Sequence, residues 1–517
     1  MMQGKEIIGK AAILGLCFLT ACTVGPKYQP PTAQAPAAFK ESPTQFKENG
    51  PWTVAQPQDA QLRGNWWEIF RDAELNDLEQ QLNINNQTIK EYFQNFMEAR
   101  AMVREARSQY FPTIGTTPSV TRQRSPSLSG GYTTAVGATT TGATTTTGAV
   151  ATPGAQTSFY SLPVDISWAP DIWGKVRNEV RNAQYSAQVS AADLENERLT
   201  EQAALAEYFF ELHGQDALMR LYAATIAADK KTLDLTRALY ETGQDDQLSV
   251  IEAQNTLQAA QASATNLGIL RAQYEHAIAV LIGKAPENFE IASRPLTTAP
   301  PQIPIGVPSL LLQRRPDIAA AERTMAAANA EIGVEMAAYY PSLTLSAGGG
   351  TEGTAIRNLV EWPSRFWSVG ASLSEEIYEG GLRRATINQY VATYNADLAS
   401  YRQTVLTAFQ QVEDYLAETR IYSKEIEQEK EVVASAENAV NLELARYETG
   451  LDPYLDVVTL QATLLADQQT LASLQISQMV GAVELVQALG GGWDTSQLPT
   501  PAQITAKPAA AETKIQH

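Results

Sequence analysis

Apolar residues recur at three- and four-residue steps along several long stretches of the chain. Residues 75–110 show such a run and predict a helix that Pro112 ends. A second helical pattern starts after Gly174, contains no proline and reaches about residue 240. Roughly 65 helical residues at 1.5 Å each would span roughly 100 Å, which is longer than a compact domain is wide. A further helix is predicted over about 248–281.

Polar and apolar residues alternate in shorter stretches, which is the pattern of half-buried strands. One face of the clearest stretch carries the apolar residues Leu162, Val164, Ile166 and Trp168. Residues 113–122 form a weaker strand candidate that would pair with this stretch. The Thr-, Gly- and Ala-rich residues 133–158 between them predict a long exposed loop.

The second half of the chain repeats this order of elements. A helix opened by Pro316 ends before Pro341, and alternating residues over 342–347 and 368–374 predict a second hairpin. A long helix then runs to about Tyr447, and a last helix covers about 455–489.

The chain also repeats itself in sequence. Ala238–Leu257 and Ala445–Leu464 share 11 identities in 20 aligned positions at a constant offset of 207 residues. Solenoid repeats are much shorter, at roughly 20–50 residues. The chain is therefore a duplicated half-protein, and its most similar part is a helix–turn–helix tip.

The N-terminus has the features of a targeting segment. A short basic region around Lys5 and Lys10 precedes an apolar stretch over 11–20, which is too short to span a membrane. Leu19–Cys22 follows and resembles a bacterial lipobox, so we expect a lipoprotein signal peptide over 1–21 and lipidation of Cys22. The alternative is an ordinary secretory signal. No cofactor is expected apart from N-acyl and S-diacylglycerol lipid on Cys22.

Composition restricts the function. The chain has a formal net charge of −19, which argues against nucleic-acid binding because that needs a basic face. The sequence holds none of the motifs GxxxxGK[ST], HExxH and GxSxG, and its only histidines are His213, His276 and His517. An enzyme is therefore not expected. A periplasmic adaptor lipoprotein, which also has a coiled-coil hairpin, is a further alternative.

The strand count predicts an oligomer. After residue 22 no stretch of 18 consecutive apolar residues occurs, so any crossing of a membrane would need a β-barrel. Each chain offers only four candidate strands, whereas the smallest closed transmembrane barrels have eight. Three chains would supply twelve strands and close the ring by cyclic symmetry. The alternative is a soluble four-stranded sheet.

Several short motifs, in this order, resemble one family. They are Cys22-Thr-Val-Gly-Pro-Lys-Tyr, Trp66-Trp67, Trp168-Ala-Pro-Asp-Ile-Trp-Gly, Arg314-Arg-Pro-Asp-Ile, Tyr340-Pro-Ser-Leu, Tyr378-Glu-Gly-Gly-Leu-Arg, Arg446-Tyr-Glu-Thr-Gly and Leu489-Gly-Gly-Gly-Trp. The chain resembles the TolC-like outer-membrane factors, in the OprM-like (NodT) lipoprotein branch that serves resistance-nodulation-division efflux systems.

The resemblance implies both architecture and partners. The fold class would be a mixed α/β membrane protein, a homotrimer with a twelve-stranded transmembrane β-barrel in the outer membrane of a Gram-negative bacterium. A long periplasmic α-helical barrel would continue it. The function would be a passive exit duct for small molecules, opened at its periplasmic tip by an adaptor protein and an inner-membrane pump.

The resemblance also places a periplasmic gate at the duplicated tips. Gly243 and Gly450 are predicted helix C-caps, because glycine adopts the left-handed conformation at little cost. The gate candidates are Asp452, Asp456, Asp245, Asp246, Tyr240, Tyr447 and Arg446. The aspartates would form acidic rings, while the tyrosines and the arginine would hold the tips shut. The alternative is that the aspartates only cap the following helices.

These interpretations divide the chain into six segments. They are a signal peptide (1–21), a lipidated extended strap (22–62), a first structural repeat (63–284, with a hairpin at about 112–170), an equatorial linker (285–308), a second repeat (309–493, with a hairpin at about 341–377) and a disordered tail (494–517).

Overall fold

The computed structural model describes residues 23–31, 35–36, 39–41, 64–124, 156–296, 300–301, 303 and 311–506. These fall into two compact units. The first, here called the sheet unit, is made of Met1–Lys27, Arg104–Arg181 and Ala330–Val391. The helical unit is made of Tyr28–Val103, Asn182–Asn329 and Ala392–His517. Cys22 and most of the predicted loop 133–158 lie outside the described residues.

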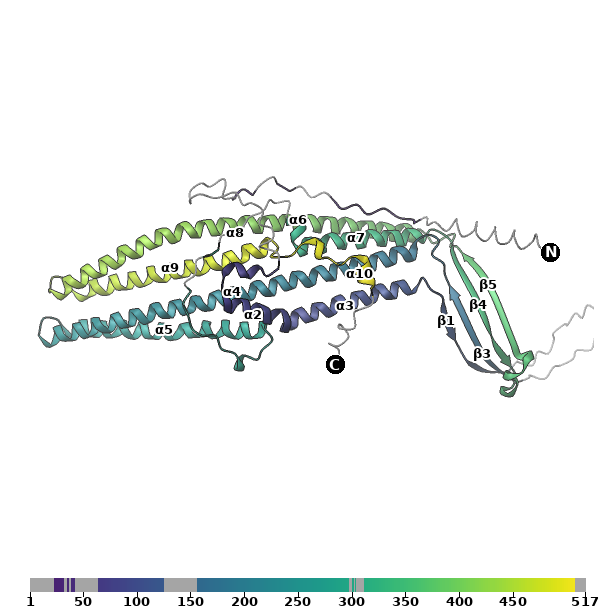
Figure 1. The fold of residues 1–517 in the computed structure, drawn as a ribbon, viewed down its shortest axis with the longest axis horizontal. Helices are drawn as coiled ribbons and strands as arrows, with labels where there is room; N and C mark the ends of the chain where they lie inside the picture. The colour runs from purple at the N-terminus through teal and green to yellow at the C-terminus, as the bar shows by residue number, and fades with distance from the viewer. Residues whose placement is uncertain are drawn as a thin grey trace, which may run out of the picture. The chain divides into compact units, whose positions relative to one another are not determined.

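The sheet unit holds an antiparallel sheet whose strands lie side by side in Figure 1. Its strands are β1 (Thr113–Thr116), β2 (Ser119–Arg124), β3 (Gln156–Trp168), β4 (Ser342–Gly353) and β5 (Arg365–Ser374). The order is β1-β3-β4-β5, and β2 also pairs with β3. The last residues of the predicted loop, Gln156 to Ser158, therefore belong to a strand.

β1 and β2 are one strand position interrupted by a proline. Thr113 pairs with Ser167 and Ser119 pairs with Ser161, so the register along β3 is the same on both sides of the break. Pro118 has no N–H to donate to a ladder, which accounts for the interruption. Both hairpins predicted from the alternation are present, and they supply four strand positions.

The sheet has an apolar and a polar face, as the alternation predicts. Side chains of paired residues share a face, so Ile114, Ile166 and Ala347 lie together. Ser161, Asp165 and Ser346 lie on the other face. Several of the apolar side chains are open in the single chain, including Val369 at 76% and Leu373 at 69% exposed.

The helices are longer and more continuous than in an ordinary domain. Their bounds are η1 (Trp66–Phe70), α2 (Ala73–Asn85), α3 (Gln87–Ser108), α4 (Lys175–Glu241), α5 (Gln247–Leu281), η2 (Pro286–Asn288), α6 (Leu311–Arg314), α7 (Pro316–Ala337), η4 (Ile356–Val360), η5 (Trp362–Ser364), α8 (Leu382–Glu448), α9 (Tyr454–Ala488), η6 (Thr495–Gln497) and α10 (Pro501–Thr505). α4 and α8 have 67 residues each, as the uninterrupted patterns predict. None of the described helices is long and apolar enough to cross a membrane.

The helix predicted over 75–110 is in fact two helices that meet at Asn86. The Asn86 side-chain oxygen accepts a hydrogen bond from Ile89 N at 2.9 Å, and its amide donates to Glu201 and to Leu281 O. An asparagine that satisfies the first N–H groups of a helix starts a new one. The periodicity misses the break because both helices bury leucines and isoleucines on one side.

The main core of the helical unit gathers aromatic side chains from η1 and α4. Trp66, Trp67 and Phe70 pack with Phe209 and Phe210, and all are at most 4% exposed. Residues from α2, α5 and α9 complete this cluster. It joins the helices of both repeats into one body.

The prediction of a disordered tail is wrong for residues 494–506. Thr500 forms a capping box with Gln503 and starts α10, which places Ile504 at 1% exposed against Val103 and Ala187. Arg100 also donates to the carbonyls of Ile504 and Ala506. One apolar side chain and one cap thus dock a segment whose composition is polar. Residues 507–517 lie outside the described part.

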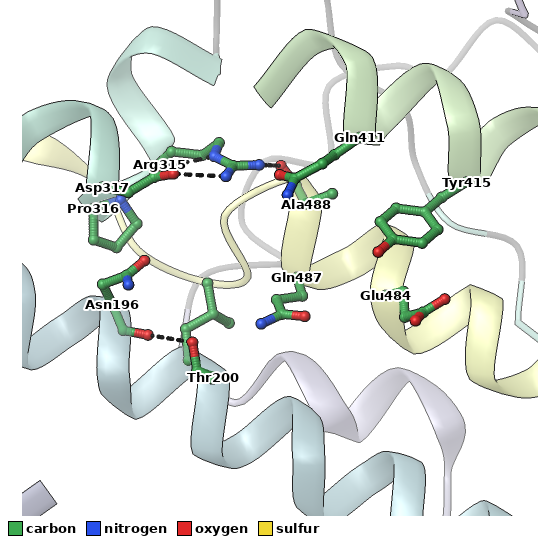
Figure 2. Close-up of a pocket in the computed structure, with 11 residues that line it drawn as sticks. Asn196, Thr200, Arg315, Pro316, Asp317, Gln411, Tyr415, Glu484, Gln487 and Ala488 are labelled. Carbon is green, nitrogen blue, oxygen red and sulfur yellow. Dashed lines mark hydrogen bonds and ion pairs between the residues drawn. The ribbon is translucent and has the colours of Figure 1, made fainter. Parts of the chain in front are cut away.

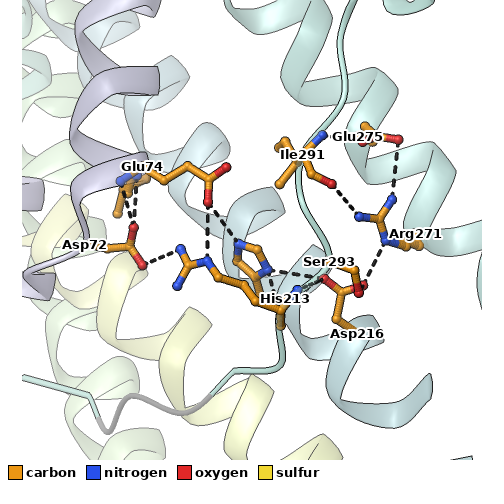
Figure 3. Close-up of polar contacts among 10 residues, drawn as sticks. Asp72, Glu74, His213, Asp216, Arg271, Glu275, Ile291 and Ser293 are labelled. Carbon is orange, nitrogen blue, oxygen red and sulfur yellow. Dashed lines mark hydrogen bonds and ion pairs between the residues drawn. The ribbon is translucent and has the colours of Figure 1, made fainter. Parts of the chain in front are cut away.

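The first part of the predicted linker is bound tightly to the helices (Figure 3). Asp216, fully buried on α4, accepts from Ser293 Oγ at 2.8 Å and from Arg294 N at 3.0 Å. Arg271 of α5 donates to the same carboxylate and to Ile291 O. The linker therefore belongs structurally to the first repeat up to about residue 294.

Candidate functional site

The two repeat tips end their long helices in the same way. In the first tip, the turn between α4 and α5, Gly243 N donates to Tyr240 O and Gln244 N donates to Leu239 O. In the second tip, between α8 and α9, Gly450 N donates to Tyr447 O and Leu451 N to Arg446 O. Gly243 and Gly450 have φ angles of 74° and 73°. This is the Schellman arrangement, in which a left-handed glycine satisfies the last carbonyls of a helix.

The first tip uses its aspartates to begin α5. Asp246 is the N-cap, and its carboxylate accepts from Ser249 N at 3.0 Å. Asp245 accepts from Ser249 Oγ at 2.8 Å and from Asp246 N at 2.8 Å. The capping alternative thus describes Asp246, while one oxygen of Asp245 is left for another partner.

The second tip is built differently, because Pro453 takes the N-cap position of α9 and provides no capping side chain. Asp452 is instead bound by Arg446 of the same tip, through Nη2 at 3.1 Å and also through Nε. The guanidinium beside Asp452 lowers the pKa of its carboxyl. Asp452 is therefore ionised at neutral pH.

One hydrogen bond joins the two tips. Tyr447 is 4% exposed, and its hydroxyl donates to the free oxygen of Asp245 and lies 3.3 Å from Thr236 Oγ1. Burial, together with the hydrogen bond to Asp245, raises the pKa of Tyr447. The Tyr447 hydroxyl therefore stays protonated, and donates to the Asp245 carboxylate, across the physiological pH range. We call this contact the cross-tip bond.

An apolar cluster surrounds the cross-tip bond. Tyr447 packs on Tyr454 with ring centroids 5.3 Å apart, and Leu233, Ala253 and Val457 complete the buried set. Helices of both tips contribute to this cluster, so it holds the helix pair of the first tip against the helix pair of the second. Figure 1 shows these pairs as α4 with α5 and α8 with α9.

The structure does not gather all the predicted gate residues. Tyr240 is 46% exposed, and Asp456 and Asp246 are also exposed. Within the described residues, no side-chain hydrogen bond is recorded for Tyr240 or Asp456. The contacts thus select Tyr447 with Asp245 across the tips, and Arg446 with Asp452 within one tip.

Two polar residues of this site escape prediction from the sequence. Thr236 is fully buried beside Tyr447. Asp229 is 5% exposed and lies about two helical turns further from the tip. Burial raises the pKa of Asp229 to about 6. The available signal was the i, i+4 pair of threonines at 232 and 236, which lies on the same face of α4 as Asp229 and Leu233.

A second polar site lies between the helices at the start of α7 (Figure 2). Arg315 there binds Asp317 through two nitrogens, at 2.6 and 3.0 Å, and donates to Ala488 O at 3.0 Å. The cavity beside it measures about 220 Å³. Because the protein itself uses the arginine's donors, this contact fastens the end of α9 to α7. Among the described residues, no cluster of side chains is suited to hold a metal ion.

Comparison with known proteins decides the family. The model of the outer membrane efflux protein family matches residues 78–284 and 307–491, which is more than half of the chain. The chain belongs to the outer membrane efflux protein family. The resemblance inferred from the motifs is confirmed.

Relatives match along nearly the whole chain. A probable efflux pump outer membrane protein, SepC of Pseudomonas putida, is 29% identical over 492 residues, covering 94% of this chain and 97% of the relative. Outer membrane protein OprJ of Pseudomonas aeruginosa is 28% identical over 502 residues, covering 95% and 97%.

Solved structures agree on the fold. The outer-membrane channel OprN superposes with a TM-score of 0.79 at 26% identity, covering 91% of this chain and all of that one. The open state of the MtrE outer membrane channel of Neisseria gonorrhoeae gives a TM-score of 0.75 at 23% identity, covering 92% and 99%. The protein has the fold of the TolC-like outer-membrane channels and is the outer-membrane duct of an efflux pump. The alternative of a periplasmic adaptor is excluded.

Proposed function

We propose that three copies of the chain form the duct. β1 and β2 lie at one edge of the sheet and β5 at the other, and both edges lack a partner within the described chain. Unpaired edges cannot face lipid, because each N–H and C=O there needs a hydrogen bond. Three chains arranged in a ring would pair each β5 with the next β1–β2 and close the wall. The apolar face would then meet lipid and the polar face would line the pore.

The cross-tip bond acts as the resting lock of the pore. This bond is the observation that carries the proposal. It joins the end of the pair α4 and α5 to the end of the pair α8 and α9, a contact that the sequence repeat alone does not predict. Arg446 and Asp452 stiffen the second tip next to it. Opening requires that Tyr447 leaves Asp245 and that the two helix pairs separate.

The duct works with a periplasmic adaptor and an inner-membrane pump of the resistance-nodulation-division type. Such partners can open it only if they bind the open state more tightly than the closed one. Exposed leucines at both tips, Leu248 and Leu455, offer apolar surface for an adaptor; they occupy the same repeat position and are 58% and 59% exposed. The chain passes small molecules passively, and the pump supplies the energy.

A lipid on Cys22 anchors the N-terminus. Support comes from the residues that follow it. Val24 N donates to Trp173 O at 3.1 Å, and Asn178 donates to Val24 O at 3.1 Å. Gly25 has a φ of 127° and lies so close to Gly333 that an added Cβ would be 2.8 Å from its Cα. This seat within the sheet unit would fix where the anchor leaves the protein.

Single-channel conductance in planar bilayers tests the lock. Tyr447→Phe removes a hydrogen bond to a charged acceptor, worth about 1.5–3 kcal/mol. The open population is then expected to rise roughly ten- to a hundredfold. Tyr454→Phe is the matched control, because its hydroxyl has no recorded hydrogen bond with the described residues. Unchanged gating in an intact Tyr447→Phe trimer would overturn the lock.

A further inference from the structure

Three arginines lie on the apolar face of the sheet. On β2, Arg122 pairs with Ser158 and Arg124 with Gln156, two and four residues beyond the pair of Val120 and Tyr160. Alternate residues of a strand share a face, so both arginines lie on the face of Val120. That face also carries Ile114, because the register is continuous across the break at Pro118.

The third arginine comes from the other edge of the sheet. Arg365 on β5 pairs with Thr351. It shares a face of the strand with Trp367, Val369 and Leu373, which follow it at even spacing. The pairing of Val369 with Ala347, and of Ala347 with Ile166, places this set on the same apolar face. Arg365 is therefore also on the side that would meet lipid.

All three arginines lie at the strand ends remote from the helices. The chain joins the helices at Thr113, Trp168, Ser342 and Ser374, whereas the arginines lie at the opposite ends of β2 and β5. Aromatic side chains accompany them there. Trp367 is 82% and Trp362 is 76% exposed, and the Arg365 guanidinium lies 4.3 Å from the centre of the Trp362 ring. Exposed tryptophans are typical of a membrane surface.

The described strands bring no carboxylate to this face. The acidic residues of the described strands, Asp165 and Glu352, pair with Gly115 and Ser161 and so lie on the polar face. A positive side chain on a lipid-facing strand is costly at the membrane centre but cheap near its surface. Arginine is also the side chain that best matches phosphate, since its planar group donates two parallel hydrogen bonds.

We propose that Arg122, Arg124 and Arg365 bind the phosphates of lipid headgroups at the outer surface of the membrane. The inference rests on the proposed insertion of the strands and on the ring of three chains. Ring closure places β5 of one chain beside β1–β2 of the next, which brings the arginines from the two edges onto neighbouring strands. A phosphate at this seam would accept hydrogen bonds from arginines of both chains and would bridge them.

Native mass spectrometry of the purified trimer, titrated with lipid A or with dephosphorylated lipid A, tests the proposal. Each arginine near an anionic surface contributes roughly fivefold in affinity, so we expect roughly a hundredfold preference for the phosphorylated lipid. The triple variant Arg122→Gln, Arg124→Gln, Arg365→Gln should lose this preference. A control variant of equal charge, Arg384→Gln, Arg402→Gln, Lys424→Gln on the exposed surface of α8, should keep it.

Each other outcome has a definite meaning. A preference that survives in the triple variant, or that is absent from the wild type, overturns the proposal. Competition by inorganic phosphate at the lipid's concentration would show a free-anion site and would also overturn it. A triple variant that forms no trimer in neutral detergent would assign the arginines to contacts between chains instead. Failure of the wild type to insert into pure phosphatidylcholine vesicles would contradict the proposed function itself, which separates the two.

Discussion

Tyr240 and Tyr447 occupy the same position in the two copies of the repeated segment, yet only Tyr447 is buried and bonded to the other tip. The identical residue thus has a different role in each copy. The partner aspartates differ in the same way, since Asp245 receives the tyrosine while Asp452 receives an arginine of its own tip. The cross-tip bond depends on which copy supplies the donor and which supplies the acceptor.

Ionisation of the buried Glu79 opposes folding. Glu79 is 0% exposed, and neither carboxyl oxygen has a recorded hydrogen-bond partner in the described chain. Burial raises its pKa well above the ordinary value. The folded state holds Glu79 in its neutral form, so its contribution to stability is fully present below the unfolded pKa of about 4.3 and is lost as pH rises through the folded pKa.

Glu79→Gln removes this titration while keeping the size of the side chain. We expect the variant to lose less stability than the wild type as pH rises from about 5 to about 8. The thermal midpoint followed by circular dichroism at several pH values measures the difference. Glu98→Gln, an exposed site on α3, should keep the wild-type slope. Equal slopes for Glu79→Gln and the wild type would show that Glu79 is not neutral in the fold.

At the scale of the element, β4 depends on glycine for its fit against β3. A Cβ added to Gly350 would lie 2.2 Å from Leu162 O and 2.8 Å from Pro163 Cα. Both obstacles are backbone atoms, so the strand itself would have to move. Neighbouring Gly349 is free of this constraint, since its nearest atom, Phe366 O, would be 3.6 Å away.

Gly350→Ala is therefore expected to destabilise the sheet by roughly 1–3 kcal/mol, and Gly349→Ala to leave it almost unchanged. The temperature at which the proposed trimer dissociates in detergent gives the readout. Similar temperatures for both variants would mean that β4 can shift along β3 without cost.

At the scale of the whole molecule, the pore is an acidic protein with carboxylates at its tips. The formal net charge is −19, and Asp452 and Asp456 stand in the second tip of every chain. In a ring of three chains these groups would come near one axis. Rings of carboxylates favour cations and disfavour anions.

Reversal potentials in a salt gradient test this arrangement. We expect a cation-selective pore, with a cation-to-anion permeability ratio that falls several-fold in Asp452→Asn, Asp456→Asn. Glu425→Gln, Glu431→Gln removes the same charge from exposed positions of α8 and should have a smaller effect. Equal effects of the two pairs would place the selectivity elsewhere than at the tips.

The sequence by itself determined the elements and their order. Uninterrupted periodicity predicted α4 and α8, alternation predicted the faces of β3 to β5, and the repeated segment located both tips. These succeed because they depend on local physics: a stripe of apolar residues fixes a helix face, and a glycine in the left-handed region ends a helix. The periodicity missed the break at Asn86 for the same reason, since a cap interrupts a helix without disturbing its apolar stripe.

Only the tertiary structure decided which groups meet. The cross-tip bond joins residues 202 positions apart, and α10 is docked by Arg100 from more than 400 positions away. Contacts at such separations depend on how helices pack, and neither periodicity nor composition encodes them. The duplication alone would suggest equivalent tips, yet Tyr447 is buried and bonded to Asp245, whereas Tyr240 is exposed and Asp452 is bound by Arg446 of its own tip.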